Sequence, residues 1–204
     1  MKFKNIYILD LEYLSWSLKS AKNIKLRKKS QPPEIIQIGL VQLNLTKFSK
    51  KIFLNLYVFP KINKIPTRIN KLTGINETIL KKRGETFEAS IKRAIEFIKP
   101  NSLIICNGND DQILNINFKL NKMKNLFIKK KLYFYNLNKI LIKMFPKKKK
   151  TTANLKKLFK LNSKLKVHDA LNDCLLINDS IKHIIKFIGK KNFLNELNLN
   201  YNKH

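Results

Sequence analysis

Three apolar, β-rich runs in the first 60 residues constrain the fold more than any other feature of this chain. They cover 5–11, 34–44 and 50–59, and only a short stretch around Lys47–Lys51 connects the last two. Such a spacing suits a hairpin connection. Pro32 and Pro33 prevent regular structure just before the second run. The order therefore predicts three consecutive antiparallel strands.

Strands and helices alternate in the rest of the chain. Two further apolar runs, at 102–107 and 131–136, predict two more strands. Apolar residues at helical spacing predict helices at 67–82, 86–98, 110–123, 137–145, 151–161 and 169–188. A three-stranded meander followed by alternating elements indicates the α/β class, with a mixed five-stranded sheet flanked by helices.

The length of 204 residues is sufficient for one domain with a hydrophobic core. No internal repeat or second boundary is evident, so we expect one domain over 1–189 and a polar C-terminal tail over 190–204. Neither cysteine belongs to a disulfide pattern, and no apolar run approaches the roughly 20 residues of a membrane span. We expect free thiols, a cytoplasmic location and no membrane contact.

The formal charge of +30 favours a polyanionic partner, of which nucleic acid is the commonest. All but four of the 43 basic residues are lysine, and asparagine and isoleucine are also abundant. These residues have A/T-rich codons, so a biased genome would give a lysine-rich surface whatever the function. The run Lys147–Lys150 illustrates both readings, since it can bind phosphates and is also typical of a solvated loop.

The first acidic cluster ends the first predicted strand. Asp10 and Glu12 are two residues apart, which puts both carboxylates on the same face of a strand. Two like charges this close repel each other unless a cation lies between them, and a divalent metal ion is the usual partner of carboxylate oxygens. The alternative is a solvated strand end without a function.

Two further acidic clusters each open a predicted helix. Asp110 and Asp111 begin one helix, and Asp169 and Asp173 follow His168 at the start of the last. Helix capping explains part of this pattern, because Asp110 and Asp169 are placed to accept hydrogen bonds from free backbone N–H groups. Asp173 lies one turn further in, where capping does not explain it.

Together the clusters supply four carboxylates and a histidine. Two divalent ions about 3.5 to 4 Å apart can activate a water and stabilise the charge on a phosphate, and four carboxylates offset the charge of such a pair. A histidine with a pKa of about 6.5 can accept the proton of the water at neutral pH. A lone histidine is more often a satisfied structural residue, so the acidic neighbours are what make His168 a candidate.

At this point the residues resemble a known family, the DEDDh 3′-to-5′ exonucleases. This family has an RNase H-like fold and four acidic metal ligands, with a histidine in the last motif. The similar segments are ILDLE at 8–12, EIIQIG at 34–39, NKLTGI at 70–75, ICNGNDDQIL at 105–114 and HDALND at 168–173.

The resemblance implies which residues hold the ions and move the proton. The metal ligands would be Asp10, Glu12, Asp111 and Asp173, for two Mg²⁺ or Mn²⁺ ions, and the general base would be His168. Asp111 is preferred to Asp110 because the family's aspartate lies three residues after the glycine, here Gly108, or four after the asparagine, here Asn107. Asp110 remains the alternative.

The second acidic motif is similar to the W-G-N-x-D form of the Eri-like and KapD-like branch, although Cys106 occupies the usual place of the tryptophan. Members of that branch act mainly on RNA 3′ ends, so the resemblance favours RNA over DNA. Five residues are expected near the terminal nucleotide, from the first motif and the L-T-G-I turn: Tyr13, Leu14, Trp16, Leu72 and Thr73.

Tyr13 and Leu14 stand where the family often has a small residue and threonine, so we expect the approach of the 3′ end to differ from that in the family. Tyr13 and Trp16 can stack on a terminal base or pack within the protein. The sequence therefore predicts a metal-dependent exonuclease that binds nucleic acid with a free 3′ end. The alternatives are a non-catalytic basic RNA-binding protein on the same fold and a DNA proofreading subunit.

Overall fold

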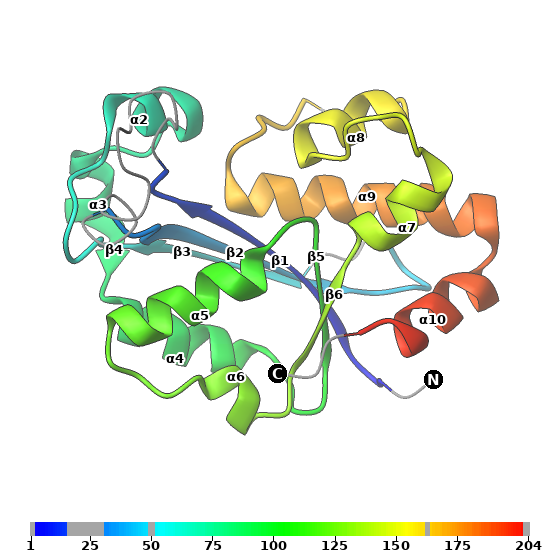
Figure 1. Ribbon diagram of the computed structural model, residues 1–204, viewed down its shortest axis with the longest axis horizontal. Helices are drawn as coiled ribbons and strands as arrows, with labels where there is room; N and C mark the ends of the chain where they lie inside the picture. The colour runs from blue at the N-terminus through cyan, green and yellow to red at the C-terminus, as the bar shows by residue number, and fades with distance from the viewer. Residues whose placement is uncertain (1–2, 16–30, 49–51, 162–163, 202–204) are drawn as a thin grey trace.

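The structure is a computed structural model, and it describes residues 3–15, 31–48, 52–161 and 164–201. A twisted sheet crosses the molecule, and helices cover both of its faces (Figure 1). This arrangement confirms the predicted class, a mixed α/β sheet flanked by helices. Among the described residues, no helix is both long and apolar enough to cross a membrane.

The sheet contains six strands in the order β4-β3-β2-β1-β5-β6. Strands β1 to β3 form the predicted antiparallel meander, and β5 and β6 continue the sheet parallel to β1. The strand bounds are β1 Ile6–Tyr13, β2 Ile35–Leu43, β3 Ile52–Val58, β4 Gly84–Glu85, β5 Leu103–Cys106 and β6 Tyr133–Asn136. The expected count of five strands is corrected by β4, which has only two residues and so leaves no alternating pattern in the sequence.

Three groups of helices cover the sheet (Figure 1). One face carries α4, Phe87–Phe97, α5, Asp110–Leu120, and α6, Leu126–Lys129. The other face carries α7, Asn138–Met144, α8, Thr152–Leu158, α9, Ala170–Ile188, and α10, Lys190–Leu199. The helices α2, Thr67–Thr73, and α3, Glu77–Arg83, lie beside the end of β1 and β2 and enclose a small core of their own.

Side chains of β1 alternate between the two main cores. Ile6 and Ile8 pack with α9 and α10 on one face, whereas Tyr7 and Leu9 pack with α4 and α5 on the other. Continuing the first series by steps of two brings Asp10 and then Glu12 to the face that α9 covers. The central strand thus directs its two carboxylates toward the start of α9.

Two regions differ from the expectation. The predicted helix at 67–82 is two helices, because Gly74 adopts a left-handed conformation (φ 81°) and caps α2 by donating its N–H to the Asn70 carbonyl oxygen. The residues expected as a polar tail form α10 up to Leu199. Phe193 and Leu197 are one turn apart and fully buried in the core, which fixes this helix against the sheet.

Candidate active site

The first turn of α9 lies directly on β2. A Cβ atom at Gly39 would be 2.3 Å from the Ala170 carbonyl oxygen, so only glycine permits this approach. The side chain of Gln37, fully buried on the same strand, accepts a hydrogen bond from the Ala170 N–H at 3.1 Å and donates to Asp169 Oδ2 at 3.1 Å. Backbone contact and one amide therefore position the residues that begin α9.

Asp169 caps α9, as the sequence predicted. It precedes the first helical residue, and its Oδ1 accepts a hydrogen bond from the Asn172 N–H at 3.0 Å. One turn further on, Asp173 is 4% exposed and points back to the loop before the helix. Its Oδ2 accepts a hydrogen bond from the His168 N–H at 3.3 Å.

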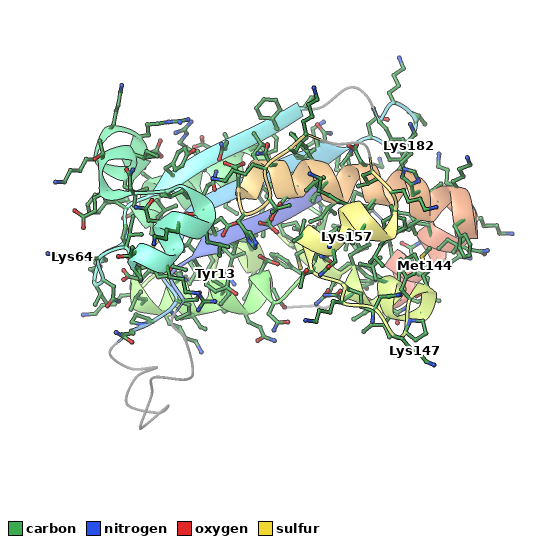
Figure 2. All side chains as sticks on the ribbon, turned by 90° about the horizontal axis from the view of Figure 1, so that it is seen from above. Tyr13, Lys64, Met144, Lys147, Lys157 and Lys182 are labelled. Carbon is green, nitrogen blue, oxygen red and sulfur yellow. The ribbon has the colours of Figure 1, made fainter. Side chains whose placement is uncertain are left out.

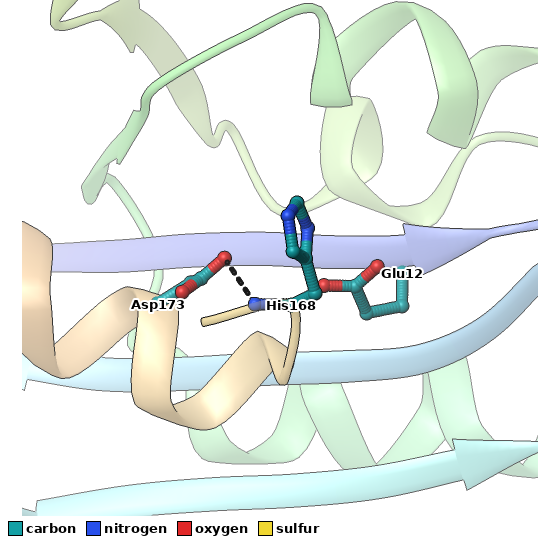
Figure 3. A group of neighbouring side chains, drawn as sticks. All are labelled: Glu12, His168 and Asp173. Atoms are coloured by element: carbon teal, nitrogen blue, oxygen red, sulfur yellow. Dashed lines mark hydrogen bonds between the residues drawn. The ribbon is translucent and has the colours of Figure 1, made fainter. Parts of the chain in front are cut away.

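His168 has an unusual backbone conformation, with φ 62°. A non-glycine residue in this region is uncommon and costs on the order of 1 kcal/mol. The consequence is visible in Figure 3, where the imidazole stands between the carboxylates of Glu12 and Asp173. One ligand atom from each of these three side chains lies within 4.8 Å of the others.

A cavity of about 280 Å³ opens at the carboxyl end of β1. Its acidic and imidazole lining comes from three separate parts of the chain: Asp10 and Glu12 from β1, Asp110 from α5, and His168 and Asp173 from the start of α9. The fold thus brings together four carboxylates and a histidine from positions up to 163 residues apart.

Asp110, rather than Asp111, faces this cavity. Asp110 is 7% exposed, and its carboxylate accepts a hydrogen bond from the Leu11 backbone N–H, which links the start of α5 to β1. The described residues that line the cavity do not include Asp111, which is half-buried. The structure therefore places Asp110 in the acidic cluster and Asp111, the candidate chosen from motif spacing, outside it.

Burial, with added repulsion from neighbouring carboxylates, raises the pKa of all four carboxyl groups that line the cavity. Burial, followed by the charge of Asp110, raises the pKa of Asp10 well above its ordinary value. Burial, followed by the charge of Asp173, raises the pKa of Glu12 to about 8. Burial is also the main cause that raises the pKa of Asp110 to about 7 and that of Asp173 to about 7. Without a cation, this site holds protons at neutral pH.

The donor set fits a divalent cation. Asp173 Oδ1 is buried and has no hydrogen-bond partner within the described part of the chain. Buried carboxylate oxygens are normally satisfied, and an unsatisfied one that faces other carboxylates is what a hard cation requires. Asp10, Glu12, Asp110 and Asp173 are placed to hold such ions.

The comparisons with known proteins agree with this geometry. Residues 8–179 match the sequence family RNase_T, described as exonuclease. The chain belongs to this exonuclease family. Membership confirms the predicted kinship with DEDDh exonucleases, while the Eri-like or KapD-like branch stays a prediction.

Solved structures of exonucleases share the fold. Cell-death related nuclease 4 is 22% identical, with a TM-score of 0.72 over 92% of this chain and 65% of that one. The nuclease domain of 3′hExo, a DEDDh family member bound to rAMP, is 20% identical, with a TM-score of 0.74 over 92% of this chain and 94% of that one. The E. coli ExoI–ssDNA complex in its zinc-bound form is 17% identical, with a TM-score of 0.68 over 92% of this chain and 42% of that one.

The chain spans just under two thirds of the first of these proteins and less than half of the last. No curated protein matches it in sequence. The RNase H-like exonuclease fold predicted from the motifs is confirmed by these structures.

The expected nucleotide contacts divide into two groups in this exonuclease. Tyr13 and Leu72 line the cavity, and Leu72 is 39% exposed. Leu14 is fully buried, and Thr73 is buried with its hydroxyl donating to the Ile69 carbonyl oxygen, so neither side chain is available to a substrate. Trp16 lies outside the described residues.

Several lining residues were not found from the sequence. The threonine pair before and at the start of α8, Thr151 and Thr152, forms one wall, and Ile69 of α2 lies in another. Asn107 donates from Nδ2 to the Lys150 carbonyl oxygen at 2.9 Å and joins the α8 wall to the end of β5. These contacts link residues that are distant in sequence, so no local pattern could have indicated them.

Proposed function

We propose that this exonuclease releases nucleotides from the 3′ end of nucleic acid, with RNA preferred to DNA. The observation that carries the proposal is the convergence of Asp10, Glu12, Asp110, His168 and Asp173 on one cavity. Support for the 3′ direction comes from the similar structures, which include a 3′-exonuclease with its histone mRNA stem-loop. The preference for RNA rests on the form of the second acidic motif.

The ligand assignment follows the cavity rather than the motif spacing. Asp10, Glu12, Asp110 and Asp173 would hold two Mg²⁺ or Mn²⁺ ions, so Asp110 replaces Asp111 in the set. Such ions, when bound, lower the pKa of a coordinated water and stabilise the developing charge on the phosphate.

In this proposal, His168 accepts the proton of the attacking water. Burial, followed by the charge of Lys166, lowers its pKa, so the imidazole is neutral and able to accept a proton at pH 7. The hydrogen bond from the His168 N–H to Asp173 holds the loop that carries the ring. Removing this proton raises the nucleophilicity of the water toward the scissile phosphate.

The apolar residues that line the cavity position the nucleic-acid strand. Tyr13 packs against the core of the opposite face while lining the cavity, so its ring forms a firm surface for a terminal base. Leu72 of α2 adds an exposed apolar side chain beside it. We place the protein in the cytoplasm.

The direct test uses purified protein with 5′-labelled RNA and DNA oligomers of the same sequence, with Mg²⁺ and with a chelator. We expect a ladder of products shortened from the 3′ end, formed faster from RNA and absent without the ion. Asp10→Ala removes a carboxylate at the centre of the cluster and should abolish the ladder. Full activity of this variant would refute the site, and binding without any hydrolysis would favour the non-catalytic RNA-binding alternative.

A further inference from the structure

Acidic and basic residues are unevenly distributed along the chain. Between Asp111 and Asp169 there are 17 lysines and not one aspartate or glutamate, so all 13 acidic residues lie in the rest of the sequence. A compositional bias toward lysine raises the number of lysines everywhere, but it does not by itself remove acids from one continuous segment. The charge of this acid-free segment therefore calls for a separate explanation.

The acid-free segment supplies one wall of the active-site cavity. Thr151, Thr152 and Ala153, at the start of α8, line it. Asn107, which follows β5 and is 9% exposed, donates from Nδ2 both to the Lys150 carbonyl oxygen at 2.9 Å and to Thr152 Oγ1 at 3.2 Å. The lysine loop, residues 147–150, is thus fixed at one end to the edge of the cavity.

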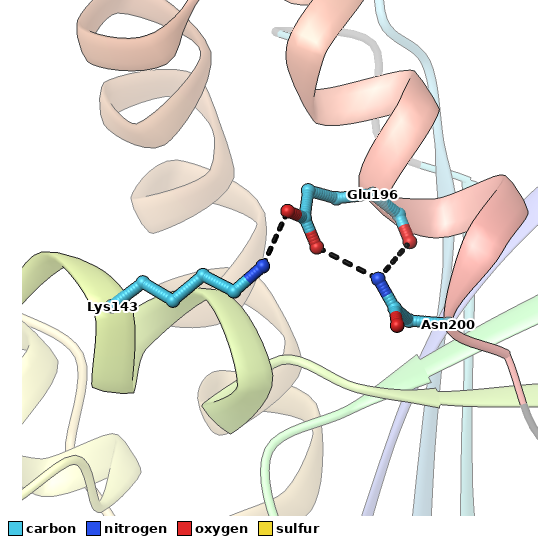
Figure 4. A network of polar contacts seen from close by, with 3 residues as sticks. All are labelled: Lys143, Glu196 and Asn200. Carbon is cyan, nitrogen blue, oxygen red and sulfur yellow. Dashed lines mark hydrogen bonds and ion pairs between the residues drawn. The ribbon is translucent and has the colours of Figure 1, made fainter.

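The lysines of this loop differ from those of α7, which belongs to the same segment. Lys143 Nζ pairs with Glu196 Oε1 at 2.5 Å, in a network that also holds Asn200, and so contributes to the attachment of α10 (Figure 4). By contrast, Lys147–Lys149 are exposed side chains at a turn. Lys157, on the exposed side of α8, lies on the same side of Tyr13 as Lys147 (Figure 2).

The two walls of the cavity differ in chemistry. On the α2 side, Ile69 and Leu72 offer apolar surface, which suits a base. On the α8 side, two threonine hydroxyls lead to exposed lysines, which suit phosphates. Suppose that the terminal base of a single-stranded nucleic acid lies against α2. Its phosphate backbone would then pass along the α8 side of the cavity and leave it over the lysine loop.

We propose that the lysine loop, together with Lys157, is the binding track for the phosphates of the single strand that precedes the 3′-terminal nucleotide. This inference rests on the proposed function and adds the surface along which the substrate lies. Contacts of this kind are independent of base sequence and sensitive to salt. The enzyme should consequently favour oligomers over dinucleotides.

The test compares two triple variants with the same change in charge. Lys147→Gln, Lys148→Gln and Lys149→Gln alter the loop. The matched control, Lys119→Gln, Lys122→Gln and Lys124→Gln, alters three exposed lysines of the same acid-free segment, on and just after α5. Binding of a fluorescein-labelled single strand of about ten nucleotides is followed by anisotropy over a range of salt concentrations, with a chelator present to prevent hydrolysis.

We expect the slope of log affinity against log salt to decrease in magnitude by about 2 for the loop variant, at about 0.7 for each lost phosphate contact. The control should keep the slope of the wild type. An equal decrease of the slope in both variants, or no decrease in the loop variant, would overturn the proposal. The effect of the lysines would then not depend on their position in the structure.

A hydrolysis measurement separates this inference from the proposed function. With Mg²⁺, the ratio of kcat/KM on the oligomer to kcat/KM on a dinucleotide should fall in the loop variant and remain as in the wild type in the control. If the wild type hydrolyses neither substrate, the proposed function fails, while the salt slopes still decide whether the loop binds the strand. A wild-type enzyme that cleaves both substrates with equal kcat/KM would count against the track.

Discussion

Carboxylates at the two ends of the α9 region have opposite surroundings. At the far end, the carboxylate of Glu196 on α10 accepts hydrogen bonds from Lys143 and Asn200, so its charge is compensated within the protein. At the near end, Asp173 has a buried oxygen without a partner in the described chain, and it faces further carboxylates. The charge of Glu196 is therefore compensated by protein groups, whereas the carboxylate of Asp173 keeps an oxygen available for a ligand.

This contrast extends to the backbone. The near end contains His168 in a left-handed conformation, held by Asp173, whereas the turn at the far end uses Gly189, for which a positive φ costs little. Strain and repulsion of this size persist only where the surrounding core stabilises them. The active site is therefore the part of the fold where substitution should change activity and stability in opposite directions.

The largest effect is expected from a pair of neighbouring variants, Asp110→Asn and Asp111→Asn. Asparagine keeps the shape of the side chain and removes the charge. Asp110→Asn should lower kcat by about a thousandfold, the upper range for loss of one electrostatic contact, and Asp111→Asn by less than about threefold. Steady-state rates on a labelled oligomer decide between them. The reverse order would restore the assignment made from motif spacing.

His168→Asn is expected to lower kcat by about a hundredfold, at the lower end of the range for a general base. In the wild type, activity should decline at acidic pH as the imidazole becomes protonated, with a midpoint below the ordinary value because its pKa is lowered. The variant should lack this decline. A pH profile with the same acidic limb in both proteins would assign the limb to another group.

The metal-free protein should lose stability as pH rises. The pKa values of Glu12, Asp110 and Asp173 are about 8, 7 and 7 in the folded state, above those of the unfolded chain. The folded state therefore binds these protons more tightly, and the contribution of these three groups to the free energy of unfolding is greatest below about pH 4 and is lost as pH rises to about 8.

Thermal melts in the presence of a chelator should show this decline as a fall in Tm of several degrees between pH 5 and pH 8. Saturation with Mn²⁺ at about 100 times its Kd should add about 2.7 kcal/mol at pH 8. The decline should be smaller in Asp173→Asn, which serves as the control. A melting temperature independent of pH in the metal-free wild type would contradict the raised pKa values of these groups.

A smaller effect is expected from Gln37→Glu, which removes the donor to Asp169 and places a second carboxylate beside it. The start of α9 should shift, and kcat should fall by about tenfold, because displacement of a catalytic group by a fraction of an ångström is costly. Gln42→Glu makes the same change at the other end of β2, in the lining of a larger cavity of about 530 Å³, and should leave kcat unchanged.

Restoration of kcat by raising Mn²⁺ in the Gln37→Glu variant would show that Gln37 acts by positioning the ligands. An equal loss of kcat in both variants would instead point to a general loss of stability.

The smallest effect is expected at the far end. Glu196→Ala removes the ion pair with Lys143, a partly exposed contact, and should lower the free energy of unfolding by about 1 kcal/mol or less. Activity should not change. Urea titration measures the free energy of unfolding, and the oligomer assay measures activity. A large loss of activity would contradict the assignment of a purely structural role to the far end.

Local rules were sufficient for part of this site. The alternation of β1 placed Asp10 and Glu12 on one face, and the capping preference identified Asp169. Motif spacing favoured Asp111, whereas Asp110 lines the cavity. Spacing alone does not decide between them, because successive residues at a helix start point about 100° apart and the preceding turn sets which one faces the sheet. That turn is fixed by tertiary contacts, among them the hydrogen bond from the Leu11 backbone.

The same limit applies to the fold. The three-stranded meander and the alternation that follows it were evident from apolar periodicity. A two-residue strand such as β4 has no periodicity to detect. The contact of Gln37 with Ala170 spans 133 residues, and the sequence contains no local trace of it. The burial of Phe193 and Leu197, in the segment expected to be a polar tail, likewise depends on a surface that distant parts of the chain create.

Gly39 has a consequence for how this protein can vary over evolutionary time. Because backbone meets backbone where Ala170 lies on β2, the separation of strand and helix at this point is not set by the volume of any side chain. Substitutions among the isoleucines and leucines of the core can accumulate without changing that separation. A chain under strong compositional drift can thus replace much of its interior while the carboxylates of β1 and α9 keep their spacing.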